Sequence, residues 1–173
     1  MQNNLTIQKN ELLPVSKDEN HTIIEIDNKM YAIKTSSVLE IIKILELEHP
    51  SELPSCILGL MKYKENPIGV INLREIFNKE KIIYDLNARI IVTKTDKGIS
   101  AIICDKVSDI KKLSEAKIKE IPYQQDSSFY SGLYINDEEN IYILDIDSIE
   151  NYISLNKDKF SYNNERYIVD DEE

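Results

Sequence analysis

Short runs of β-branched and aromatic residues, separated by polar turns, recur along most of the chain. Segments 22–26 and 30–33 flank the turn-forming residues Asp27-Asn28-Lys29, and this pattern predicts a β-hairpin. Hairpins at this spacing, without a βαβ alternation, predict a mainly β protein, and small barrels are expected because a closed sheet leaves few exposed edges. By the same pattern, three further hairpins and one single strand are expected at 57–63 with 68–73, 87–95 with 99–105, 130–135 with 141–144, and 107–113.

Two short helices are expected among these strands. Apolar residues recur at helical spacing over residues 38–45, and Ser37 with Glu40 has the form of a capping box at the start of that segment. The second helix is expected to begin at Asp147, which forms a D-x-x-E capping box with Glu150. Each helix would turn one apolar face toward the sheets.

Composition restricts the classes of function. The 173 residues are 42% hydrophobic, enough for a substantial core, and carry a formal net charge of −10. So acidic a chain repels phosphate backbones and anionic lipids, which argues against general binding of nucleic acids or membranes. Cys56 and Cys104 lie in apolar runs and are expected to be buried free thiols. Because residues 1–10 lack a signal-peptide core and no apolar run approaches a membrane span, we expect a cytoplasmic protein.

The sequence offers little catalytic or metal-binding chemistry. His21 and His49 lie in polar surroundings without a second His or Cys close in sequence, and are expected to be ordinary surface histidines. The four glycines form no phosphate-binding loop, and a Cys–His nucleophile pair stays open on sequence alone. Asp145 and Asp147 form a carboxylate pair, for which a strand end and a helix cap are the favoured roles. We therefore expect no catalytic residue, no cofactor and no metal site.

Five segments, taken in order and spacing, carry a family resemblance. They are Tyr31-Ala32-Ile33 with Val38-Leu39-Glu40-Ile41-Ile42, Leu53-Pro54 with Ile57-Leu58-Gly59-Leu60-Met61, Val70-Ile71-Asn72-Leu73-Arg74, Arg89-Ile90-Ile91-Val92 with Ile103-Cys104-Asp105-Lys106-Val107, and Ile143-Leu144-Asp145-Ile146-Asp147. With these segments the chain resembles, over about residues 22–155, the CheW-like adaptor domains of bacterial chemotaxis. The segments correspond to that family's V-x-E-I helix, Gly-led strand, P-V-I-D-L-R strand, R-I-I-V…L-V-D-x-V hairpin and L-L-D-L-D helix entry.

The resemblance implies a fold of two small five-stranded β-barrels packed side by side with short helices. The expected domain spans residues 21–157, with one barrel at about 20–85 and the other at about 86–155, although the chain can cross between them. Residues 1–20 would form an N-terminal arm. Residues 158–173 would form an acidic C-terminal tail, which is either disordered or packs its aromatic residues on the domain.

The resemblance also implies a function. Members of the family are non-enzymatic adaptors that connect the cytoplasmic tip of a chemoreceptor to the regulatory domain of a CheA-type histidine kinase, and they pair with other CheW-like domains. An apolar groove between the barrels and the barrel ends are the implied binding surfaces. The residues that match the family's interaction positions are Val38, Glu40, Ile41, Gly59, Lys64 and Arg74.

For several of these positions a purely structural role is an open alternative. Val38 and Ile41 are equally suited to core packing, and Lys64 is equally suited to an ordinary solvated turn. Arg74 could pair with a nearby carboxylate, either Glu75 or Asp105.

The departures from the family concentrate at one turn, although Gly69 also replaces the family's proline and Asn72 its aspartate. Lys64 keeps the positive charge of the family's N-L-R-G turn but not the bidentate fork of arginine, and Glu65 replaces the glycine, which makes a positive φ costly. A specialised CheW-like module outside the motility array, with a different kinase or a dedicated receptor, therefore stays open. A small β-barrel enzyme or ligand-binding domain is a third alternative, which would require a deep pocket with converging polar groups.

Overall fold

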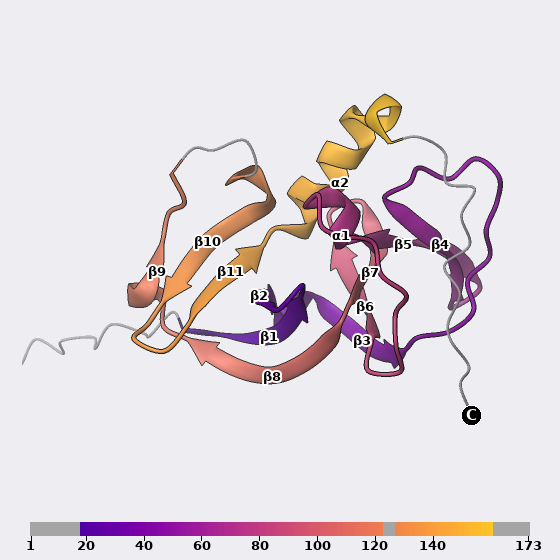
Figure 1. Cartoon of the computed structure of the whole chain (residues 1–173). Coiled ribbons are helices and arrows are strands. Elements are labelled where there is room, and N and C mark those ends of the chain that lie inside the picture. The colour runs from indigo at the N-terminus through magenta and orange to yellow at the C-terminus, as the bar shows by residue number, and fades with distance from the viewer. Residues whose placement is uncertain (1–17, 123–126, 161–173) are drawn as a thin grey trace, which may run out of the picture.

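The computed structural model describes residues 18–122 and 127–160, which form two β-sheets with two short α-helices (Figure 1). The strands are β1 (Glu19–Ile26), β2 (Lys29–Lys34), β3 (Val38–Lys43), β4 (Ile57–Tyr63), β5 (Asn66–Asn72), β6 (Arg89–Thr95), β7 (Gly98–Cys104), β8 (Lys106–Leu113), β9 (Ile118–Lys119), β10 (Tyr130–Ile135) and β11 (Asn140–Leu144). The α-helices are α1 (Leu73–Ile76) and α2 (Ile146–Leu155), and the 3-10 helices are η1 (Thr35–Ser37), η2 (Glu115–Lys117), η3 (Ser127–Phe129) and η4 (Lys157–Lys159).

The strand order confirms the expected mainly β class. The six-stranded sheet has the order β8-β1-β2-β11-β10-β9, and the five-stranded sheet has the order β3-β6-β7-β5-β4. Neighbouring strands are antiparallel except for the pairs β2–β11 and β5–β7, which are parallel. All four expected hairpins form, and the expected strand at 107–113 is β8.

Neither sheet is closed by strand pairing, which corrects the expectation of closed five-stranded barrels. Short connections join the edges instead. In the five-stranded sheet only four residues separate the end of β3 from Glu48, which exchanges two backbone hydrogen bonds of 2.8 Å with Leu60 on the opposite edge. In the six-stranded sheet four residues separate β8 from β9, which pairs with β10. Because so short a connection spans at most about 17 Å, each sheet must curl until its two edges approach.

The sheets do not follow the expected barrel limits of 20–85 and 86–155. The five-stranded sheet uses strands within residues 38–104, and the six-stranded sheet uses strands on both sides of that interval. The reason is that the β1–β2 hairpin pairs with β8 and with β11 rather than with its neighbour β3. The chain therefore crosses between the sheets twice, at η1 and at Asp105.

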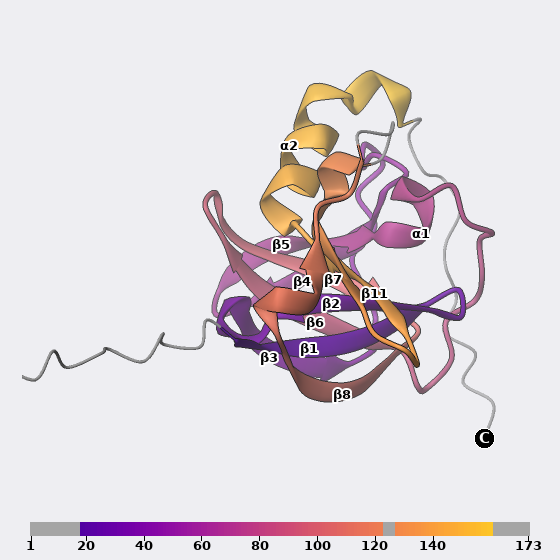
Figure 2. The same cartoon turned by 90° about the vertical axis from the view of Figure 1, so that its left-hand side faces the viewer.

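Buried apolar side chains form three clusters. One fills the space between the sheets and under α2, with Ile24, Tyr31, Ile71, Leu73, Ile102, Phe129 and Ile149 among its members. A second lies inside the curl of the five-stranded sheet and a third inside the curl of the six-stranded sheet. Helix α2 lies above the strands, while β3 and β8 lie on the opposite side of the molecule (Figure 2).

The expected helix over 38–45 is wrong, because residues 38–43 form strand β3. Ile41 and Ile42 pair with Ile91 and Ile90 of β6, so β-branched side chains contact each other across the sheet. A helix of about two turns has little stability of its own, and this long-range pairing outweighs the helical spacing of the apolar residues.

Two further expectations need correction. Helix α2 is capped by Asp145, whose Oδ1 accepts a 2.9 Å hydrogen bond from the Ser148 amide, because Asp145 is the last extended residue before the helix. Asp147, the expected cap, lies in the first turn and accepts a hydrogen bond from the Asp96 amide. His21 is buried rather than superficial, because β1 is paired on both sides, with β2 and β8.

The two terminal regions fall largely outside the described structure. Residues 1–17 of the expected arm and 161–173 of the expected tail lie outside the described residues. Of the remaining tail, Asp158 and Lys159 lie in η4, and the Phe160 ring packs edge-on against Tyr152 with centroids 6.1 Å apart.

Candidate protein-interaction surface

The outer face of β3 and its extension exposes apolar side chains. Along residues 39–45 the odd-numbered positions point to solvent, and Leu39, Ile41 and Leu45 are 44%, 39% and 39% exposed. Ile42 and Ile44 point the other way and pack on the cluster inside the five-stranded sheet. This alternation is that of a strand with one buried face. We call Leu39, Ile41, Lys43 and Leu45 the β3 outer face.

Strand β3 is also an edge strand. It pairs only with β6 among the described residues, so its other edge carries backbone groups that no described strand satisfies. A bulge between Val38 and Glu40 interrupts the register and lets Val38 pack on the core between the sheets. An edge strand that exposes apolar side chains is a site where another chain can add by contact and by backbone pairing.

The loop between α1 and β6 extends this apolar surface. Lys43 of β3 pairs with Arg89, and Arg89 Nη1 donates a 2.8 Å hydrogen bond to the Leu86 carbonyl, so the loop passes beside the end of β3 (Figure 1). Leu86 and Ile83 of the loop are both largely exposed. The exposed apolar side chains therefore continue beyond β3 onto a neighbouring segment.

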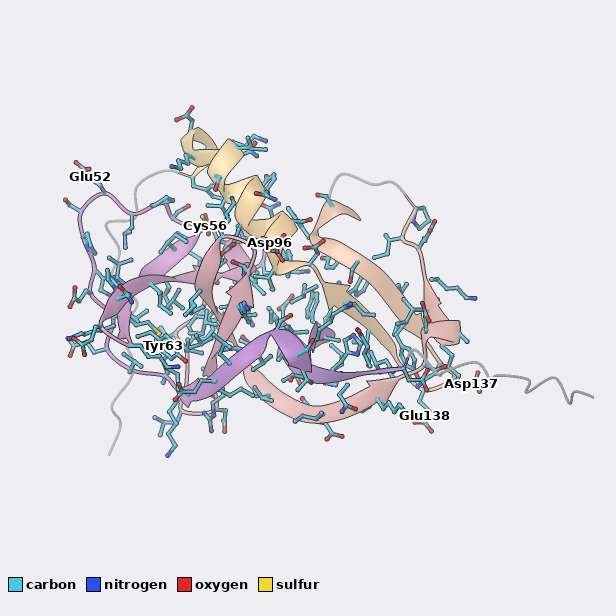
Figure 3. The ribbon with its side chains drawn as sticks, turned by 180° about the vertical axis from the view of Figure 1, so that it is seen from behind. Glu52, Cys56, Tyr63, Asp96, Asp137 and Glu138 are labelled. Atoms are coloured by element: carbon cyan, nitrogen blue, oxygen red, sulfur yellow. The ribbon has the colours of Figure 1, made fainter. Side chains whose placement is uncertain are left out.

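The β4–β5 turn lies at the end of β4 away from α2, next to Tyr63 (Figure 3). Lys64 and Glu65 form a two-residue turn with φ values of +44° and +68°, so the non-glycine Glu65 does adopt the costly left-handed conformation. Glu65 forms an exposed ion pair with Lys62 at 2.8 Å, and Lys64 Nζ lies 5.3 Å from the centroid of the Tyr63 ring. The turn therefore holds the long, positively charged side chain of Lys64 at a defined backbone position.

Gly59 serves close packing. A Cβ at this position would lie 2.6 Å from Leu47 Cβ and 3.0 Å from the Glu48 carbonyl oxygen. Only glycine lets the segment that follows β3 approach β4 so closely. Gly59 thus holds together the two edges of the five-stranded sheet rather than offering a contact to solvent.

Arg74 is the centre of a buried ion-pair network between the sheets. Its side chain is 7% exposed and binds Asp105 in a bidentate manner, with Nε–Oδ1 at 3.2 Å and Nη2–Oδ2 at 2.6 Å. Asp27, in the β1–β2 turn, lies 3.6 Å away, and Nη1 donates to the Glu80 carbonyl at 3.1 Å. Burial by itself lowers the pKa of Arg74, but its hydrogen bonds and charge interaction with Asp105 outweigh burial and raise that pKa.

The six predicted positions therefore do not form one site. Glu40 and Ile41 lie on β3 at one edge of the five-stranded sheet, while Lys64 lies at the end of β4, the other edge strand. Arg74 and Gly59 hold elements in place beneath these surfaces. Of the two carboxylates considered for Arg74, Asp105 is its partner, whereas Glu75 accepts a hydrogen bond from Ser55.

Sequence reasoning missed four exposed apolar residues. When residues 38–45 are assigned to a helix, the helical spacing places Leu45 on the buried apolar face. It gives no reason to expect that Leu39 is exposed. The signal that was available is that apolar residues stand in adjacent pairs at 38–39, 41–42 and 44–45, which is more than one buried face of a strand can use. The missed residues are Leu39, Leu45, Ile83 and Leu86.

Across residues 18–122 and 127–160, no group of three or more His, Cys, Asp or Glu side chains is placed to hold a metal ion. Within the same part of the chain, none of the helices is long and apolar enough to cross a membrane.

Comparison with known proteins accounts for this architecture. The family model for the CheW-like domain matches residues 21–152. The chemotaxis protein CheW of Klebsiella aerogenes is 25% identical over 130 residues, which cover 73% of this chain and 78% of that protein. A crystal structure of the scaffolding protein TtCheW from Thermoanaerobacter tengcongensis has the same fold, with a TM-score of 0.70 at 22% identity, covering 79% of this chain and 88% of that one. Since the family model matches most of its residues, the chain belongs to the CheW-like domain family.

Proposed function

We propose that the protein is a non-enzymatic adaptor of chemotaxis signalling, which joins the cytoplasmic tip of a chemoreceptor to the regulatory domain of a CheA-type histidine kinase. Membership of the CheW-like family and similarity to the chemotaxis protein CheW and to the scaffolding protein TtCheW support this role. The observation that carries it is the β3 outer face, an apolar strip on an unpaired sheet edge. The role places the protein in the cytoplasm.

An adaptor needs two surfaces that can be occupied at the same time. The β3 outer face suits an apolar partner and is assigned to the receptor, because Ile41 in this face and the nearby Val38 and Glu40 match family positions near the receptor-facing groove. The β4–β5 turn with Lys64 is assigned to the kinase or to a like domain, because it lies on the other edge strand of the same sheet. Arg74 and Gly59 act as positioning residues, since both are engaged in packing within the protein.

Separate substitutions at the two surfaces test this assignment. Ile41→Lys places a charge in the centre of the apolar strip and is expected to weaken receptor capture about tenfold or more, while kinase capture is retained. Lys64→Glu is expected to weaken kinase capture while receptor capture is retained, because it reverses the positive charge of the turn. Capture by purified receptor tip and by purified kinase regulatory domain, measured separately, gives both readouts.

The matched control is Ile110→Lys. Ile110 is 57% exposed on β8, the edge strand of the six-stranded sheet, so the substitution adds the same charge to an equivalent exposed edge. It is expected to leave both captures unchanged. Equal capture of receptor by the Ile41→Lys variant and by the unsubstituted protein would remove β3 from the proposed interface.

The β4–β5 turn also favours a second candidate function. Glu65 occupies a left-handed position where the family has glycine, so this turn presents different chemistry from the standard one. A CheW-like module that serves a different kinase or a dedicated receptor outside the motility array would account for the change. Genes for chemotaxis proteins beside this gene would favour the first function, and capture of a kinase of another type would favour the second.

A further inference from the structure

Two positive charges stand side by side at the end of β3. Lys43 lies directly opposite Arg89 of β6, in a register that runs without interruption from Glu40 to Lys43. Directly opposite residues of antiparallel strands point to the same face of a sheet, so both side chains leave the sheet on the face that carries Ile41. Like charges in this arrangement repel each other, and the pair is therefore expected to lower the stability of the sheet.

No acidic side chain of the described residues neutralises this pair. Neither Lys43 nor Arg89 forms an ion pair with any residue that the structure describes. Two carboxylates close in sequence are turned elsewhere: Glu40 belongs to the opposite face of β3, and the Asp85 carboxylate accepts hydrogen bonds from the amide and the side chain of Asn87. A chain with 31 acidic and 21 basic residues offers many carboxylates, so two neighbouring cations without one are unexpected.

The Arg89 guanidinium is fixed on one side and open on the other. Its Nη1 donates hydrogen bonds of 2.8 and 2.7 Å to the carbonyls of Leu86 and Ala88. Among the described residues none accepts a hydrogen bond from Nε or Nη2, and both of these atoms reach solvent. Nε and Nη2 are the two donors with which Arg74 binds Asp105. The same fork of Arg89 is therefore held ready for a carboxylate from outside the described structure.

The lysines of the other open edge strand are compensated within the protein. On β8, Lys106 pairs with Glu25 at 2.9 Å, and Lys111 pairs with Glu139. Open sheet edges with such internal ion pairs are protected from other chains. The unpaired cations thus lie at the edge that also exposes the apolar side chain of Ile41.

We propose that Lys43 and Arg89 bind a carboxylate of the receptor segment that covers Ile41, and that this contact determines which receptors the protein accepts. The inference rests on the proposed adaptor function, since it names the chemistry of the partner at the same surface. The segment that fits carries an apolar side chain beside an Asp or Glu. A receptor with a neutral or basic residue at that place is rejected, because binding would cover two cations without a counter-charge.

Reversing the charge of Lys43 tests the contact. The probes are the purified cytoplasmic tips of the chemoreceptors encoded in the same genome, and their dissociation constants are measured. Lys43→Glu is expected to weaken receptor binding about tenfold, while the melting temperature does not fall because the repulsion with Arg89 is removed. Lys94→Glu is the matched control. Lys94 is exposed on the opposite face of β6 from Arg89, so the same charge change there is expected to leave receptor binding unchanged.

A charge exchange identifies the receptor carboxylate. Each Asp and Glu of the receptor tip is changed singly to Lys. One of these changes is expected to weaken binding of the unsubstituted protein about tenfold and to restore most of the binding that Lys43→Glu loses. Rescue by one position alone would show a direct contact, because a general effect of net charge would be relieved by many positions.

The outcomes separate this inference from the adaptor function. If Ile41→Lys loses receptor binding but Lys43→Glu keeps it, the adaptor function stands and the charge contact is overturned. The contact is overturned as well if no receptor change restores binding of the Lys43→Glu variant. If the unsubstituted protein binds none of the receptor tips, the adaptor function itself fails, and the inference fails with it.

Discussion

The edge strands β3 and β8 hold equivalent places in the two sheets but present opposite chemistry to solvent. In strand order β3, β6, β7, β5 and β4 correspond to β8, β1, β2, β11 and β10, and each series contains one parallel pair at the same place. Strand β8 carries lysines in ion pairs with acidic residues, a common protection of an open edge. Strand β3 exposes Leu39 and Ile41, whereas Ile110 is the one large apolar side chain that β8 exposes among its charged residues.

The correspondence extends to individual residues. Cys56 and Phe129 each accept a backbone hydrogen bond, from the amides of Asn72 and Asp145 at 2.8 and 2.9 Å, and both of these amides belong to residues that cap a helix. A bulge precedes the glycine of each hairpin, between Ile57 and Gly59 and between Tyr130 and Gly132. The hydrogen bonds and bulges that recur in both halves belong to the fold. Features that differ between the halves are therefore the ones that we associate with function.

Each helix anchors to the hairpin turn of the opposite sheet, but with different strength. Arg74 of α1 reaches Asp27 in the β1–β2 turn and Asp105, in a buried network. Asp147, at the matching position of α2, accepts a 2.6 Å hydrogen bond from the Asp96 amide in the β6–β7 turn, and this bond is exposed to solvent. The two anchors are equivalent in topology and unequal in burial.

Among the substitutions that test this comparison, Asp105→Ala is expected to lower the free energy of unfolding the most. The substitution leaves Arg74 buried without its bidentate partner, which costs about 3–5 kcal/mol of unfolding free energy. Asp147→Ala removes one exposed hydrogen bond and is expected to cost about 1 kcal/mol. Urea denaturation of both variants measures the difference, and equal losses would show that burial does not distinguish the two anchors.

Gly59→Ala is expected to cause the second-largest loss of stability. The new Cβ meets Leu47 Cβ at 2.6 Å and a backbone oxygen at 3.0 Å, and neither atom can move without shifting the segment, so we expect a loss of about 1–3 kcal/mol. The new Cβ of Gly132→Ala would lie 2.6 Å from Ile118 Cγ2, and its nearest backbone oxygen, that of Lys119, is 3.4 Å away. A smaller loss is expected there because a side chain can rotate away. Thermal denaturation of the pair tests the order, and the reverse order would contradict it.

Alkaline pH is expected to weaken the core that the two sheets share. Burial raises the pKa of the Cys56 and Cys104 thiols to about 12, from a usual value near 9. Between these values the unfolded chain has released protons that the folded chain keeps, so the unfolding free energy falls as pH rises. We expect a loss of about 1 kcal/mol per thiol between pH 8 and pH 10, measured by urea denaturation.

The double variant Cys56→Ala and Cys104→Ala provides the control, since it should lose less stability over the same pH interval. A thiol reagent at pH 8 gives a second readout, because both thiols are fully buried and should react only after unfolding. Rapid labelling of the folded protein would refute the assignment of both cysteines to a dry core.

The hairpins were predictable from sequence because their determinants are local. Turn residues such as Asp27 and Asn28, which adopt φ values of +54° and +58°, stand between alternating apolar runs, and both signals lie within a few residues. Family resemblance supplied the order of segments, and the structure exposes Glu40, Ile41 and Lys64, three of the six residues that the resemblance matched to interaction positions.

Strand β3 and the Arg74 network depend on contacts that no local pattern contains. Residues 38–45 fit a helix by spacing, and only the pairing with β6, about fifty residues later, makes them a strand. The choice of Asp105 as partner of Arg74 follows from the crossing of the chain between the sheets at that residue. The exposure of Leu39 and Leu45 could not be predicted before the strand was assigned.

Glu65→Gly is expected to change the free energy of unfolding the least. It tests how the β4–β5 turn differs from the β10–β11 turn. The β4–β5 turn holds Glu65 at φ +68°, whereas in the β10–β11 turn the Asn136 side chain accepts hydrogen bonds from the Glu138 and Glu139 amides at 2.9 and 2.7 Å. Relief of the left-handed strain, about 1–2 kcal/mol, exceeds the entropy cost of glycine, so we expect a net gain of about 0.5 kcal/mol. The exposed ion pair with Lys62 that is lost contributes little.

Glu138→Gly is the matched control in the other turn. Glu138 has no positive φ to relieve, so only the entropy cost remains and a small loss of stability is expected. If Glu65→Gly stabilises the protein and also leaves kinase capture unchanged, Lys64 rather than the shape of the turn carries the contact. If Glu65→Gly destabilises the protein, the ion pair with Lys62 is worth more than the strain, and the turn of this chain is adapted to glutamate rather than merely tolerant of it.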